Sequence, residues 1–282
     1  MNKLILKSAT VLTAALIIAP TLATTVSADT AASYNSSANV TFAAGTASTT
    51  PVDPTDPSTP ATPTNPDGTD PEPGTAGPLS IDFASSLSFG TQVISASDQT
   101  YYAHAQTLTD STTGPNYVQV TDTRGTLSGW SLSVNTDAQL HLATVDPTST
   151  PETSDTTPGD YLTGATISFS GGYVAGTATT GTPTGTTGTY TVGADATTIM
   201  NAAANQGAGT WVYGLGAGVS GTTNDVLGAN NAAYQENGGA PLANSDVSTA
   251  SPITLSVPGT TAKKAAAYTT DLIWTLSDTP AN

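Results

Sequence analysis

Apolar and polar residues alternate along most of the chain from Leu79 onward. Apolar residues separated by one polar residue occur at Leu79, Ile81 and Phe83, at Val118 and Val120, at Leu140 and Leu142, at Ile167 and Phe169, and at Ile253, Leu255 and Val257. Successive side chains of a β-strand point to opposite faces, so this pattern predicts strands with one buried face. Turns rich in Gly, Asn and Asp separate these segments. We therefore expect an all-β fold, mostly antiparallel, in the form of a β-sandwich or barrel.

One segment, residues 195–205, has a different pattern. Asp195 is a suitable helix N-cap. Ile199, Met200 and Ala203 give a one-sided apolar stripe, as in an amphipathic helix. We therefore expect a single short helix here, inside an otherwise β domain.

Two motifs in the sequence each contain a tryptophan followed two positions later by a leucine. The first is Trp130-Ser131-Leu132. The second follows the pattern Y-x3-L-x-W-x-L-x3-P near the C-terminus and is formed by Tyr268, Leu272, Trp274, Leu276 and Pro280. The two-residue period of a strand places Trp130 and Leu132 on one face. By the same count, the first four residues of the second motif share a face, so both segments are expected to be half-buried strands.

Three further segments accompany these motifs: Phe89-Gly90-Thr91-Gln92, residues 98–102, and residues 117–125 directly before the first motif. Together with the motifs they resemble the WxL family, non-covalent cell-surface proteins of Gram-positive bacteria, over residues 79–282. The resemblance implies a C-terminal domain that associates with peptidoglycan or with partner surface proteins. Partners in such families include other WxL proteins, WxL-interacting proteins and LPxTG-anchored proteins.

The two indoles have two alternative roles. Each would bury roughly 150–250 Å² as an anchor of the core. Alternatively, an exposed indole of Trp130 or Trp274 would stack on a sugar ring of the cell wall. Arg124, the only arginine of the chain, lies between Asp122 and the Gly125 turn. It is expected to form a structural ion pair near the first motif, or else to bind a carboxylate of the wall through both guanidinium arms.

The N-terminal part of the chain has a different composition from the domain. Residues 1–28 have the pattern of a secretory signal peptide, with Lys3 and Lys7 before an apolar run and Val26-Ser27-Ala28 as cleavage site. Residues 29–78 contain a short strand-like stretch at 39–43, followed by a Pro/Thr/Asp-rich segment that we expect to be a disordered, semi-rigid linker. No other segment is long and apolar enough to span a bilayer, so no membrane span is expected in the mature protein.

The charge and the polar residue types exclude several functions. The formal net charge is −16 at pH 7, which argues against binding nucleic acid or anionic lipid. The chain has no cysteine, so thiol chemistry is impossible. His104 and His141 lack metal-ligand spacing, and the acidic residues form no hydrolase motif. We therefore expect no enzymatic activity, no metal and no cofactor.

The last feature is the mode of attachment to the cell. The chain ends without an LPxTG-type signal and has no lipobox cysteine, so covalent attachment is not expected. The sequence therefore predicts a secreted protein that binds peptidoglycan non-covalently at the cell surface through residues 79–282. The alternative is a protein–protein interaction module that assembles with other surface proteins, with indirect wall retention or a role in adhesion.

Overall fold

The computed structural model describes residues 34–46, 49–108, 112–145, 157–178, 181–216 and 252–281. The chain divides into two compact units, Met1–Thr41 and Phe42–Asn282. All of the strands described below belong to the second unit. The segment expected to be a signal peptide lies outside the described residues.

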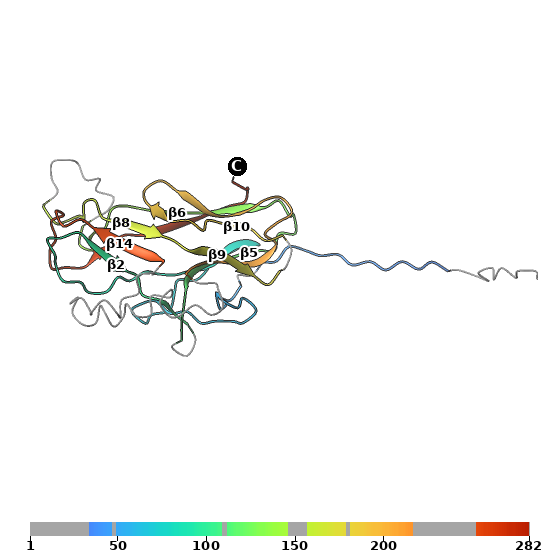
Figure 1. Ribbon diagram of the computed structural model, residues 1–282. Helices are drawn as coiled ribbons and strands as arrows, with labels where there is room; N and C mark the ends of the chain where they lie inside the picture. The colour runs from blue at the N-terminus through green and yellow to red at the C-terminus, as the bar shows by residue number, and fades with distance from the viewer. Residues whose placement is uncertain are drawn as a thin grey trace, which may run out of the picture. The chain divides into compact units, whose positions relative to one another are not determined.

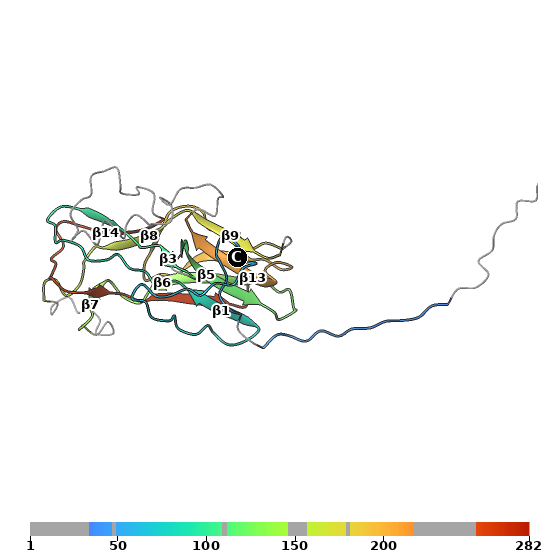
Figure 2. The ribbon, with the colours of Figure 1, turned by 90° about the horizontal axis from the view of Figure 1, so that it is seen from below.

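Three four-stranded antiparallel sheets make up most of the second unit (Figures 1 and 2). The first contains, in order, β1 (Leu79–Ala84), β5 (Asn116–Asp122), β13 (Gly209–Leu215) and β9 (Gly172–Gly176). The second contains β10 (Thr184–Gly185), β12 (Thr197–Ala202), β6 (Trp130–Thr136) and β16 (Leu272–Ser277). The third contains β11 (Tyr190–Val192), β8 (Thr166–Phe169), β14 (Ile253–Val257) and β2 (Gln99–Tyr102).

Two short antiparallel pairs complete the described strands. β15 (Tyr268–Thr269) pairs with β7 (His141–Leu142), and β3 (Gln106–Thr107) pairs with β4 (Thr113–Gly114). The expectation of an all-β, mostly antiparallel fold is therefore confirmed. Within the second unit, β14, β8 and β7 lie toward one end, and β9, β13 and β1 lie toward the other (Figure 2).

A single main core joins the inner faces of the three large sheets. Its fully buried side chains include Trp130 and Leu132 of β6, Phe169 of β8, and Trp211 and Tyr213 of β13. β6 shows how the sequence encodes this core, because its residues alternate strictly between buried and partly buried positions from Trp130 to Thr136. That alternation is what a strand with one face in the core requires.

The helix expected at residues 195–205 is not present. The segment instead forms β12, which pairs with β6 in the second sheet. The register shifts between Thr198 and Met200, so the strand contains a β-bulge or a similar irregularity at that point. As a result the consecutive residues Ile199 and Met200 are both buried. Two adjacent buried residues break the period-two pattern, which is why the sequence indicated a helix.

The Pro/Thr/Asp-rich segment packs against the domain, which differs from the expectation of a disordered linker. Val52 and Ala61 are buried in a second apolar cluster together with Phe83, Leu108, Tyr117 and Val212. The physical reason lies in β5, all of whose residues are buried. One face of β5 contributes Val118 and Val120 to the main core, and the opposite face needs a separate cover.

Polar contacts fix the same segment in place. Val52 N donates to Oε1 of Gln119 at 2.8 Å, and Gln119 Nε2 donates to the carbonyl oxygen of Thr50 at 3.2 Å. Gln119 Nε2 also donates to Oδ2 of Asp82, a buried carboxylate. Asp82 accepts two further hydroxyl hydrogen bonds, from Ser80 at 2.7 Å and from Thr121 at 2.6 Å. The buried carboxylate therefore connects β1, β5 and the proline-rich segment.

Candidate functional site

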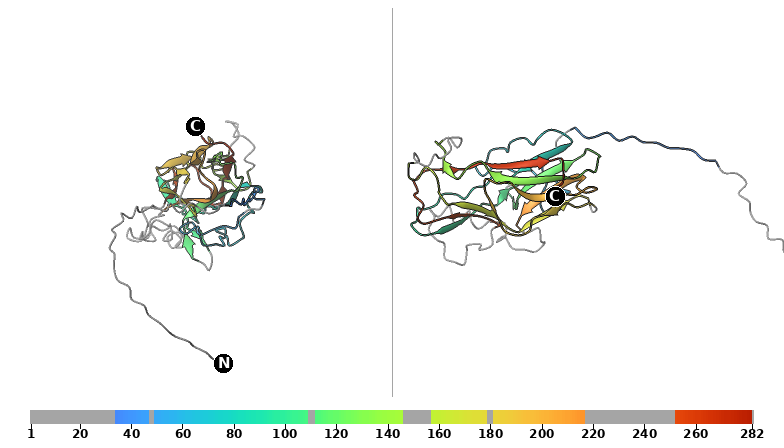
Figure 3. Two further views of the ribbon diagram at one scale, coloured as in Figure 1. Left: turned by 90° about the vertical axis from the view of Figure 1, so that its right-hand side faces the viewer. Right: turned by 90° about the horizontal axis from the view of Figure 1, so that it is seen from above.

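The two tryptophan motifs occupy neighbouring strands of one sheet. β6, which begins at Trp130, is hydrogen-bonded to β16, which contains Trp274, in antiparallel register. In Figure 3 (right) the red strand β16 runs alongside the green strand β6. In this register Trp274 is the partner of Val134, and Leu276 is the partner of Leu132. The two motifs, far apart in the sequence, therefore form one structural element.

Trp130 is enclosed by the core and has no exposed surface. Its indole Nε1 donates a hydrogen bond of 3.0 Å to the carbonyl oxygen of Gly207. Gly207 has a φ of 77°, and a Cβ at this position would collide with the indole ring. Only glycine suits such a position, because a side chain would be strained there and would displace the indole. An indole held in this way offers no face to a ligand.

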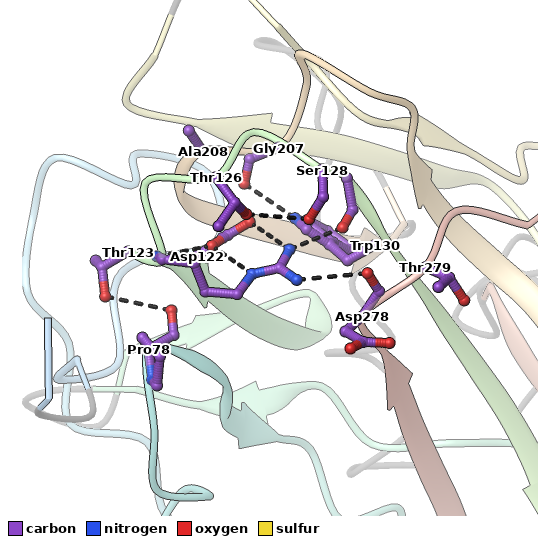
Figure 4. A network of polar contacts seen from close by, with 12 residues as sticks. Pro78, Asp122, Thr123, Thr126, Ser128, Trp130, Gly207, Ala208, Asp278 and Thr279 are labelled. Carbon is purple, nitrogen blue, oxygen red and sulfur yellow. Dashed lines mark hydrogen bonds and ion pairs between the residues drawn. The ribbon is translucent and has the colours of Figure 1, made fainter. Parts of the chain in front are cut away.

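Arg124 links the beginning of the first motif to the end of the second. Figure 4 shows Asp122 and Asp278, two of the residues that it joins. Its Nε and Nη2 atoms donate to the two carboxylate oxygens of Asp122 at 3.0 and 2.8 Å. Nη2 also donates to the carbonyl oxygen of Gly129, next to Trp130, at 2.7 Å. Nη1 donates to the carbonyl oxygen of Asp278, directly after β16, at 3.4 Å.

The pKa of Arg124 reflects these contacts. The hydrogen bonds to the Asp122 carboxylate raise the pKa above its ordinary value, in spite of the opposing effect of partial burial. A guanidinium group whose donors are engaged by Asp122 and two carbonyl groups holds protein atoms together. We therefore assign Arg124 a structural contact between the two motifs.

The second motif lies closer to the surface than the first. Leu272, Trp274 and Leu276 are partly buried and pack against the main core, while Ile273 between them is 42% exposed. The Trp274 ring is stacked on Phe169, with ring centroids 6.4 Å apart and an interplanar angle of 20°. Trp274 therefore differs from Trp130, because it contacts the core and also reaches the surface.

The sequence count placed Tyr268 on the same strand as the other residues of the second motif, but the structure does not. Tyr268 belongs to β15, which pairs with β7, whereas β16 pairs with β6. The chain breaks between the two strands because the Asp137 carboxylate accepts hydrogen bonds from the Thr270 hydroxyl and the Asp271 amide. The Tyr268 hydroxyl donates to the carbonyl oxygen of Gly159 at 2.6 Å. Pro280, the last residue of the motif, is partly buried after β16.

A groove with a volume of about 1590 Å³ adjoins the second motif. Residues 81–94 form one side of it, and residues 263–274, including Trp274, form the other. Its apolar lining includes Leu87 and Phe89, and its polar lining includes Ser88, Gln92 and Thr270. Pockets for small molecules usually measure about 300–1,000 Å³, so the groove has room for part of a polymer.

Two lysines lie along the groove in different environments. Lys264 forms an ion pair with Asp160. Lys263 Nζ donates to three backbone carbonyl oxygens, those of Ser95, Pro258 and Thr261, at 2.9 to 3.2 Å. The ammonium group of Lys263 therefore joins the segment after Phe89 to the loop after β14, and the cation holds one end of the groove in shape.

Sequence reasoning identified the motif residues but not the groove. The segment Phe89–Gln92 was noted in the sequence only as part of a family pattern, and the structure places it in the groove wall. The groove arises from the spacing between two chain segments about 180 positions apart, which no local pattern encodes. Among the residues that the structure describes, no group of three His, Cys, Asp or Glu residues could hold a metal ion.

The comparison with known families decides the identity of this arrangement. The model of the family described as "WxL domain surface cell wall-binding" matches residues 29–280, nearly the whole chain. The chain belongs to the WxL family. The resemblance inferred from the two motifs is thereby confirmed, and the WxL match extends beyond residues 79–282 to include the N-terminal segment and the proline-rich segment. No curated protein and no solved structure matches the chain.

Membership of the WxL family gives the protein a cell-surface binding role and a location at the cell surface or cell wall. Within the described ranges, no helix is long and apolar enough to cross a membrane.

Proposed function

We propose that the protein is exported and binds peptidoglycan directly and non-covalently through the groove beside the second WxL motif. The observation that supports this proposal is the position of Trp274. Its indole packs on Phe169, and the residue also lines a groove with room for a polymer. An aromatic ring among hydroxyl and amide side chains is the combination that a sugar ring, with its apolar faces and polar edges, would contact.

The charge of the protein supports a short-range mechanism. The chain carries a formal net charge of −16 at pH 7, and Gram-positive walls are usually anionic, so long-range attraction does not bring the two together. Contacts within the groove, which are apolar or hydrogen-bonded, work at short range and are little affected by salt. The role proposed here is attachment, with no catalytic step.

The test measures binding of the protein to isolated walls treated with protease until they are free of protein. Trp274→Ala should weaken this binding about tenfold or more, equivalent to about 1.4 kcal/mol. Thr275→Ala is the matched control, because Thr275 is the next residue of β16, is exposed and does not line the groove. Thermal unfolding of both variants shows whether they remain folded.

Two results would contradict the proposal. Retention of full binding by folded Trp274→Ala would remove the groove from the mechanism. Failure of the unmodified protein to bind protein-free walls, together with binding to untreated walls, would show that a partner surface protein mediates retention.

A further inference from the structure

The outer edge of β16 presents unpaired backbone groups. β16 is the last strand of its sheet, with β6 on one side only. The amide of Asp137 donates to the carbonyl oxygen of Asp271, so the backbone of Asp271 points toward the β6 side. Backbone groups of a strand alternate between its two edges, which places those of Leu272, Trp274 and Leu276 on the outer edge. Among the described residues these groups have no hydrogen-bond partner in another strand.

This open edge lies beside the groove. Leu272 and Trp274 both line it, and residues 81–94, which include part of β1, form the opposite wall. β1 lies near β16 but belongs to a different sheet and does not pair with it. An open edge next to a partly apolar groove is the arrangement that accepts an added strand, with backbone hydrogen bonds along the edge and alternate side chains in the groove.

A segment of the same chain has the properties of such a strand. From residue 34 to 44 the even positions are Tyr34, Ser36, Ala38, Val40, Phe42 and Ala44, and the odd positions are Asn35, Ser37, Asn39, Thr41 and Ala43. The even face is thus the apolar one, and its large side chains are uncovered: Tyr34 is 93% exposed, Val40 75% and Phe42 88%. A strand pattern of this length with an uncovered apolar face indicates an unsatisfied pairing partner.

Charge distinguishes this segment from the other strands that could pair with the edge. Two β16 strands pairing with each other would bring Asp271 and Asp278 of one copy near those of the other, which is unfavourable in a chain of net charge −16. The chain has no charged residue from Thr30 to Val52. The segment 34–44 therefore approaches the acidic ends of β16 without direct charge repulsion.

We propose that residues 34–44 of one copy of the protein add as a strand to the outer edge of β16 in a second copy. Val40 and Phe42 then lie in the groove beside Trp274, and the backbone of the added strand pairs with Leu272 and Trp274. The donor and acceptor surfaces differ, so the contact is head-to-tail and joins copies into a chain or a closed ring. The inference rests on the edge and the groove alone and does not require that the groove also binds peptidoglycan.

Light scattering over a range of concentrations tests the association, using protein that begins at residue 29. The unmodified protein should form dimers and longer species as its concentration rises. Val40→Ser with Phe42→Ser should weaken association at least tenfold, because the apolar face of the donor is lost. Asn39→Ser with Thr41→Ser is the matched control on the polar face and should leave association unchanged. A protein that is monomeric at all concentrations would overturn the proposal, and so would equal behaviour of the two double variants.

Disulfide trapping tests the location of the contact, because the natural chain has no cysteine. A mixture of two single variants, Thr41→Cys and Ile273→Cys, should give a cross-linked heterodimer on mild oxidation. Ser256→Cys, which is exposed on β14, is the control acceptor and should not cross-link above background. Cross-linking of Ser256→Cys to the same extent would contradict the assignment to β16. A cross-link that forms only within one molecule, in a chain with both Thr41→Cys and Ile273→Cys, would show that the donor fills its own edge.

The outcome for self-association is distinguishable from the outcome for wall binding. Loss of the Val40 and Phe42 side chains removes self-association but leaves the groove intact, so binding to protein-free walls should remain. If those variants associate normally while Trp274→Ala loses wall binding, the strand-addition proposal fails and the proposed function stands.

Discussion

Leu276 of the second motif lies directly opposite Leu132 of the first, as antiparallel partners in one sheet. The spacing of each motif follows from this relationship, because a tryptophan and a leucine two positions apart share the inner face of a strand. The two tryptophans on that face differ in how deeply they are buried. Trp130 is buried in the core, whereas Trp274 is partly exposed beside the groove.

Trp130→Ala should destabilise the protein by about 3–5 kcal/mol, since it removes a fully buried indole and leaves a cavity. Trp274→Ala removes a partly buried indole and should cost about 1–2 kcal/mol. Chemical denaturation followed by circular dichroism measures both values. Equal costs for the two variants would show that the difference in burial does not govern their contributions.

Arg124→Lys should destabilise the protein by about 1–2 kcal/mol, although the charge is retained. A lysine cannot reproduce the bidentate contact with Asp122 together with the bond to the Gly129 carbonyl. Lys264→Gln is the comparison, because the Lys264–Asp160 pair is more exposed and should contribute less than about 1 kcal/mol. Denaturation midpoints give the two effects, and a larger loss for Lys264→Gln would contradict the assigned role of Arg124.

Asp82→Asn should loosen the proline-rich segment and destabilise the protein by about 1–3 kcal/mol. Asp82 accepts hydrogen bonds from both Gln119 and Thr121. The side-chain NH2 group of an asparagine at this position would face these donor groups and could not accept their hydrogen bonds. Limited proteolysis within residues 53–69 should become faster. Asp67→Asn, an exposed turn residue of the same segment, should leave the cleavage rate unchanged.

Stability should fall at acidic pH through Asp137. Burial would raise the pKa of Asp137, but hydrogen bonds from Asp271, Thr270 and Ala138 outweigh it and lower the pKa below the ordinary 3.8. A carboxyl group with a lowered pKa in the folded state stabilises the protein above pH 3.8, and the stabilisation is lost as pH falls through the lower folded-state value. Unfolding midpoints measured from pH 5 to pH 2 should therefore decline less steeply in Asp137→Asn. Identical slopes in both proteins would exclude Asp137 as a source of acid sensitivity.

Wall binding should resist salt and strengthen on mild acidification. Both the protein and the wall carry negative charge, and protonation of carboxylates toward their reference pKa values near 4 reduces the repulsion between them. Salt at about 0.1 M screens the same repulsion over about 10 Å. The bound fraction on isolated walls should rise between pH 7 and pH 5. Release by about 0.3 M NaCl at pH 7 would instead indicate an ionic mechanism.

Local patterns in the sequence predicted the features that depend on neighbouring residues. The alternation around Trp130 gave the strand β6 and its buried face correctly. The expectation at Ile199 and Met200 was wrong, because the register shift in β12 places two consecutive side chains on the buried side. The sequence contains no local sign of such an irregularity, since it is defined by the pairing partner.

Features that depend on distant residues could not be predicted. Val52 is held by a hydrogen bond to Gln119, 67 positions away. The Pro/Thr/Asp-rich composition around Val52 is that of a free linker, so the sequence alone did not indicate this contact. The groove likewise requires knowledge of how residues 81–94 and 263–274 are spaced in three dimensions. Family patterns marked Trp274 and Phe89, but only the structure shows that both line the same groove.

The pairing of β16 with β6 also determines when the protein can fold. Residues 272–277 are synthesised about 140 positions after the strand that begins at Trp130, yet they cover one edge of that strand. Long-range pairing of this kind is slow, and a chain still being synthesised lacks the strand that completes the sheet. The second sheet therefore remains incomplete until the second motif has been synthesised, so its folding depends on the whole stretch of chain between the two motifs.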